Sequence, residues 1–145
     1  MSRIVRGFGS LLLGAALVVT FAGPVSAAGA TATTIRVDVG ATETFTTTGG
    51  ALCPSGTAAS FDFRFGGGPR AGSFHLTKTL TCDDHSGSFT IEVDAAVVFG
   101  SPTDQGGWSV ADGTGAYDGL RGGGSLVGTY TDTGIIDLYT GRVTR

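Results

Sequence analysis

The chain has 145 residues, of which 41% are apolar, only 14% are charged and 26 are glycine. This length is typical of one domain and disfavours a two-domain enzyme, and the glycines follow no three-residue period, which excludes collagen. Nine Phe, three Tyr and one Trp supply material for a core and disfavour disorder. The net charge of −3 disfavours nucleic-acid binding, because such modules carry a basic patch.

Residues 1–27 have the pattern of a secretory signal peptide. Arg3 and Arg6 precede an apolar stretch at 11–22, and small residues offer cleavage sites up to position 30. A permanent membrane anchor is the alternative, but the stretch is shorter than the ~20 residues that span a bilayer. We therefore expect cleavage, no membrane span afterwards, and a single secreted β domain over residues 31–145.

Alternation of apolar and polar residues with a period of two recurs along this domain, and no helical stripe appears. Strands are expected at 35–39, 42–48, 61–65, 72–82, 89–99, 108–110, 126–131 and 135–143. Turn-forming residues separate them at 53–56, 66–69, 83–87 and 132–134, with a loop at 100–107 and a glycine-rich segment at 113–124.

About eight short antiparallel strands with one buried face predict an all-β fold, a closed barrel, with a two-sheet sandwich as the alternative. Closure removes the exposed edges that aggregate, and an eight-stranded barrel is either filled by side chains or holds one small ligand. The residues expected to be largely buried are Phe63, Phe74, Leu76, Ile91, Val93, Val97, Trp108, Leu126 and Leu138.

The two cysteines, Cys53 and Cys82, predict a disulfide. They are an even number in a chain with an export signal, and neither CxxC spacing nor a nearby histidine pair suggests a metal site. A reactive thiol pair is the alternative, but no neighbouring Lys or His would lower a thiol pKa.

Lys78 shares the alternating face of Phe74, Leu76 and Leu80. Because lysine is almost never fully buried unless it is paired, the favoured interpretation is that a bulge or strand end turns it to solvent. The alternative places it in the barrel interior, as a polar contact of a largely apolar ligand site.

Catalytic and metal-binding signatures are absent from the sequence. His75 and His85 are expected at the surface, and no GxSxG motif accompanies them. The acidic residues do not follow the spacing of a calcium loop. No cofactor or metal is predicted, and a non-enzymatic role is favoured over a catalytic one.

Residues 113–122 read Gly-Thr-Gly-Ala-Tyr-Asp-Gly-Leu-Arg-Gly. They lack the Gly-Lys-Ser/Thr ending of a phosphate loop, and they resemble the GTGxFxGxRG-type loop of the dirigent and allene oxide cyclase family of eight-stranded barrels. The Cys-Asp-Asp-His-Ser-Gly-Ser-Phe segment at 82–89 and Tyr-Thr-Gly-Arg at 139–142 are similar to those of small secreted proteins, of uncharacterised role, from high-GC bacteria. The resemblance implies a barrel in which this loop supports the architecture.

The sequence therefore predicts a secreted, non-enzymatic β-barrel that binds a small apolar ligand. A dirigent- or cyclase-like barrel enzyme and a purely structural envelope module are the alternatives, and the oligomeric state is left open. Four polar or amphipathic residues are the candidate ligand contacts: Lys78, Trp108, Tyr117 and Arg121.

Overall fold

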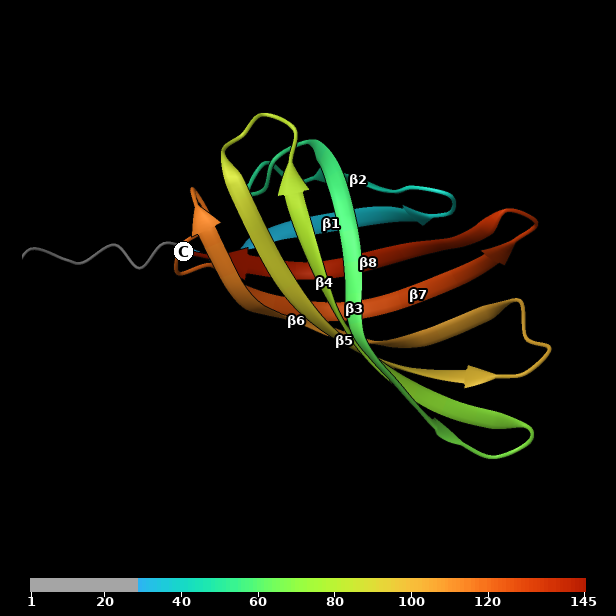
Figure 1. The fold of residues 1–145 in the computed structure, drawn as a ribbon. Coiled ribbons are helices and arrows are strands. Elements are labelled where there is room, and N and C mark those ends of the chain that lie inside the picture. The colour runs from blue at the N-terminus through green and yellow to red at the C-terminus, as the bar shows by residue number, and fades with distance from the viewer. Residues whose placement is uncertain (1–28) are drawn as a thin grey trace, which may run out of the picture.

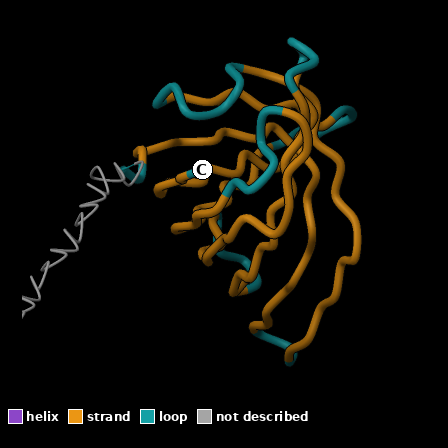
Figure 2. Tube along the Cα trace, turned by 90° about the vertical axis from the view of Figure 1, so that its left-hand side faces the viewer, coloured by secondary structure: helices purple, strands orange, loops and turns teal. Residues whose placement is uncertain are grey.

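The computed structural model describes residues 29–145, so the predicted leader lies outside the described residues. The strands are β1 (Thr31–Val39), β2 (Glu43–Thr48), β3 (Ser55–Gly67), β4 (Ala71–Cys82), β5 (Gly87–Val98), β6 (Thr103–Gly115), β7 (Arg121–Thr131) and β8 (Gly134–Thr144). Each strand pairs antiparallel with the next, and β1 pairs with β8 to close a barrel. Over these residues, Figures 1 and 2 show strands and loops and no helix. The predicted all-β closed barrel is therefore confirmed, and the alternative two-sheet sandwich is wrong.

The up-and-down order gives the barrel two different ends. The β1–β2, β3–β4, β5–β6 and β7–β8 turns lie together at one end, towards the right in Figure 1, where the β3–β4 and β5–β6 hairpins bend away from the others. We call this the open end. The C-terminus and the three remaining connections lie at the other end, which we call the closed end.

The closed end is packed with large side chains from all around the barrel. Phe45 of β2 and Phe89 of β5 meet edge to face, with ring centroids 5.9 Å apart, and Tyr117 of the β6–β7 connection packs on Phe89 at 5.4 Å. The predicted disulfide is present here, because Cys53 before β3 is bonded to Cys82 at the end of β4. Both cysteines are buried in the core.

Most of the predicted core is confirmed. Ile91, Val93, Val97, Trp108 and Leu126 are buried, whereas Phe74 and Leu76 are half-buried. The prediction is wrong for Leu138, which is 41% exposed on the outer face of β8. Its neighbours on either side, Asp137 and Tyr139, point inwards instead, opposite Val37 and Ile35 of β1. Apolar residues occupy both faces of β8, so alternation could not identify the inner one.

The predicted burial of Phe63 is also wrong, although a β-bulge in β3 turns this side chain inwards. Phe61 pairs with Thr77 and Arg64 with His75, so two residues of β3 oppose one residue of β4. Asp62 lies in the bulge with a φ of 54°. The extra residue reverses the alternation, so that Phe63 faces the barrel interior, but it lies at the hollow open end, where it is 63% exposed.

The predicted loop at 100–107 is also partly wrong, because β6 already begins at Thr103. Gly106 pairs with Ala95 of β5 and Gly107 pairs with Asp94. A Cβ on Gly106 would lie 2.0 Å from the carbonyl oxygen of Asp94, so this glycine permits a close approach of two strands. Gly106, one of the glycines that indicated a loop, therefore lies where two paired strands approach closely.

Candidate functional site

A cavity of about 610 Å³ occupies the open end of the barrel. It lies within the 300–1,000 Å³ that is typical of small-molecule sites. Its walls are mainly apolar, and the apolar side chains that form them are Val39, Phe63, Phe65, Phe74, Leu76, Val97, Val98, Phe99 and Ile135. The barrel is therefore filled at one end and hollow at the other.

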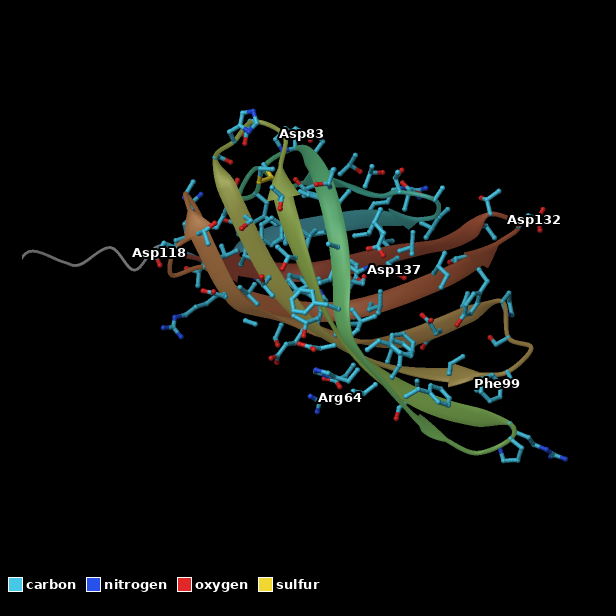
Figure 3. The ribbon with its side chains drawn as sticks, viewed as in Figure 1. Arg64, Asp83, Phe99, Asp118, Asp132 and Asp137 are labelled. Carbon is cyan, nitrogen blue, oxygen red and sulfur yellow. A yellow bond between two sulfur atoms is a disulfide. The ribbon has the colours of Figure 1, made fainter. Side chains whose placement is uncertain are left out.

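Aromatic side chains surround the mouth of the cavity. Phe63 and Phe74 stack with ring centroids 6.0 Å apart, and Phe65 and Phe99 meet at 6.1 Å. Phe65 and Phe99 are each about half exposed, and Figure 3 shows Phe99 at the open end. These rings present apolar surface to whatever enters.

Lys78 lies at the floor of the cavity and is only 1% exposed. The favoured interpretation, that it turns to solvent, is therefore wrong. Its Nζ lies 3.2 Å from Oδ2 of Asp137 on β8 and 3.6 Å from Oε2 of Glu43 on β2. Two carboxylates therefore offset the cost of burying this charge.

Hydroxyl groups hold these two carboxylates in place. Ser60 of β3 donates to Glu43, at 2.9 Å from Oε2, and Tyr139 donates to Oδ2 of Asp137 at 3.0 Å. Burial, and then the charge of Asp137, raises the pKa of Tyr139 far above its usual value. Asp137 lies in the middle of the barrel in Figure 3, between the packed end and the cavity.

Asp104 supplies a third carboxylate to the cavity lining and is itself buried. Its Oδ1 accepts the backbone N–H of Gly128 at 3.0 Å, and its Oδ2 accepts the hydroxyl of Tyr130 at 3.1 Å. Burial is the main reason that the pKa of Asp104 is raised, and the negative charge of Asp137 adds to it, although both hydrogen bonds oppose the rise. Burial likewise raises the pKa of Tyr130.

Of the four predicted ligand contacts, Lys78 lines the cavity and the other three lie elsewhere. Trp108 packs against Tyr139 with ring centroids 6.2 Å apart, and its indole N–H donates to the carbonyl of Thr140 at 3.3 Å. Arg121 is exposed at the start of β7. Whether any of the four contacts a ligand stays a prediction.

Tyr117, the fourth candidate, is buried where the glycine-rich loop covers the closed end. Its hydroxyl lies 3.2 Å from the hydroxyl oxygen of Ser86. A Cβ on Gly113 would lie 1.9 Å from the carbonyl oxygen of Tyr117, so the loop can fold back over the barrel only with glycine there. The loop thus serves the packing of the closed end.

Glu43 and Asp137 were not predicted from the sequence as partners of Lys78. A signal was available for Asp137, which alternates with Ile135 and Tyr139 on one face of β8. A lysine on the apolar face of one strand predicts a carboxylate on the apolar face of another strand, because buried charges are paired. Sequence alone could not indicate which acidic residue fulfils this role, since β4 and β8 are not adjacent in the barrel.

The two histidines lie away from the cavity lining. His75 Nδ1 is 2.9 Å from Oδ1 of Asp94, and His85 is exposed in the β4–β5 turn. Within residues 29–145, no three His, Cys, Asp or Glu side chains are grouped so that they could hold a metal ion. Nor does this part of the chain contain a helix long and apolar enough to cross a bilayer.

Comparison with known proteins found no matching family model, no matching curated protein and no matching solved structure. The resemblance of residues 113–122 to the dirigent and allene oxide cyclase loop stays a prediction.

Proposed function

We propose that this chain is a secreted binding protein that holds a small, largely apolar molecule in the cavity at the open end of its barrel. The observation that carries the proposal is the cavity itself, which combines about 610 Å³ of space with apolar walls and a charged floor. Ligand sites have this composition, with mostly apolar linings and a few placed polar groups that fix orientation.

The exposed phenylalanines support the same proposal. Phe63, Phe65 and Phe99 are each 49% or more exposed at or near the mouth, in a protein of modest size. Grouped apolar surface of this kind marks an interaction site. An apolar ligand that covered these rings would remove their surfaces from water, at roughly 25 cal/mol for each Å² buried.

Secretion is supported by two features. Residues 1–27 have the composition of a signal peptide, and the Cys53–Cys82 disulfide is of the kind that persists in oxidising compartments outside the cytoplasm.

Filling the cavity tests the binding role. The variant Leu76→Trp places a large ring within the lining, whereas the control Val127→Trp adds the same ring on the outer face of β7, where Val127 is 40% exposed. The probe is an uncharged, apolar fluorescent molecule, so the anion anilinonaphthalene sulfonate is not suitable. We expect this probe to bind the parent and Val127→Trp with equal affinity and to bind Leu76→Trp more weakly. Equal binding to all three proteins would overturn the proposal.

A further inference from the structure

We infer that the molecule held in this cavity is an organic cation, with an ammonium-type head group on the charged floor and an apolar body against the phenylalanines. This inference rests on the proposed function and specifies its ligand class. It follows from the charge of the floor, from the direction of its hydrogen bonds and from the aromatic rings around it.

The charge of the floor is unbalanced. Glu43, Asp104 and Asp137 all line the cavity, and among residues 29–145 Lys78 is the only basic residue in its lining. Even with Asp104 neutral, because burial raises its pKa, two carboxylates face one ammonium group. A cation entering the cavity would restore neutrality, whereas an anion would add to the existing repulsion.

The hydrogen bonds of the polar residues that line the cavity also favour a cation. The hydroxyls of Ser60 and Tyr130, both in the lining, already donate to carboxylates of the protein, and Ser101 donates to the carbonyl of Thr103. Within residues 29–145, the hydrogen bonds that Asp137 accepts from Lys78 and Tyr139 both reach its Oδ2, so neither of these donors occupies Oδ1. The floor therefore offers acceptors, and an N–H donor on the ligand would match them.

The arrangement suits an organic cation better than a metal ion. Among the described residues, no three His, Cys, Asp or Glu side chains are grouped so that they could hold a metal ion. Phe63 and Phe74 line the same cavity, and aromatic rings attract alkylammonium groups. A bare metal ion would gain nothing from these apolar walls.

Three probes that share one body and differ in head group test the inference: phenylbutylamine, phenylbutanol and phenylbutanoate. Binding of each is measured by titration calorimetry at neutral pH and low ionic strength. We expect the amine to bind about tenfold more tightly than the alcohol, and the alcohol more tightly than the carboxylate.

Matched variants locate the source of this preference. Glu43→Gln removes a negative charge from the floor, and Glu92→Gln removes one from the exposed outer face of β5. The ratio of amine to carboxylate affinity should fall about tenfold in Glu43→Gln and remain unchanged in Glu92→Gln. If Glu43→Gln does not fold, the relative affinities of the parent protein for the amine, the alcohol and the carboxylate still test the inference.

Each outcome has a defined meaning. An amine preference that depends on Glu43 supports the inference. Equal affinity for amine and alcohol, or tighter binding of the carboxylate, overturns it and leaves the proposed binding function intact. An equal loss of the preference in both variants also overturns it, because the preference would then arise from the net charge of the whole protein. Absence of binding by all three probes overturns the proposed function together with the inference.

Discussion

Replacing Lys78 by methionine would remove the buried charge and retain most of the side-chain volume. In the parent protein, Nζ lies 3.2 Å from the carboxylate of Asp137, which corresponds to a Coulomb attraction of about 5 kcal/mol at an effective dielectric constant of about 20. Part of this attraction is offset by the desolvation of Lys78. Loss of one partner of a buried ion pair generally costs about 3–5 kcal/mol, because the other charge is left uncompensated.

The exposure of the partners places the expected loss at the lower end of that range. The Asp137 and Glu43 side chains keep 13% and 21% of their surface exposed to the cavity, so water can partly solvate them. We therefore expect Lys78→Met to lower the free energy of unfolding by about 3 kcal/mol. In the double variant Lys78→Met/Asp137→Asn, much of this loss should be recovered, because the unpaired carboxylate is removed as well.

Urea denaturation followed by circular dichroism provides the measurement. Arg36→Met is the control, because Arg36 also pairs with an aspartate, Asp38 at 2.6 Å, but both of these side chains are nearly half exposed. Exposed pairs contribute at most about 1 kcal/mol. If Lys78→Met and Arg36→Met lost similar small amounts of stability, or if Asp137→Asn gave no recovery, the buried pair would not have the role assigned to it.

Two further predictions concern the disulfide and the third carboxylate. Cys53→Ala/Cys82→Ala should lower the unfolding free energy by about 3.6 kcal/mol, because the bridge closes a loop with a sequence separation of 29 residues; a loss under about 1 kcal/mol in urea titrations would contradict this. Since the folded-state pKa of Asp104 is raised, the stability that this residue contributes is present below its unfolded-state pKa of about 3.9 and is lost as the pH rises through the folded value. Asp104→Asn does not ionise, so the stability of the parent relative to this variant should fall with rising pH, by no more than about 1.4 kcal/mol per pH unit. Urea titrations across the acidic range check this, and a pH-independent difference would show that Asp104 ionises as freely in the folded protein as in the unfolded one.

The strand pattern and the disulfide could be predicted from the sequence because both depend on local or pairwise signals. Alternation along β5 alone, for example, identifies Ile91 and Val93 as interior residues. The pattern fails where one residue changes the phase, as at Asp62, or where both faces are apolar, as around Leu138. These errors arise from the geometry of strand pairing, which the composition of a single strand does not encode.

The candidate site was harder to predict, because it depends on side chains brought together across the barrel. Lys78 stood out as a cation on an apolar face, but its partners Glu43 and Asp137 lie on strands far from it in sequence. Alternation also cannot distinguish a filled interior from a hollow one. That difference depends on how many large side chains each end of the barrel receives.

The two ends of the barrel tolerate substitutions differently, because only the closed end is filled with packed side chains. Phe89 and Tyr117 are fully enclosed at the closed end, so truncating either would leave a void and cost several kcal/mol. Phe63, Phe65 and Phe99 at the mouth have little packing to lose, because about half or more of each side chain is already exposed. Substitutions there can reshape the entrance with small effects on folding. The shape of the mouth can therefore diverge between related chains while the barrel that supports it stays the same.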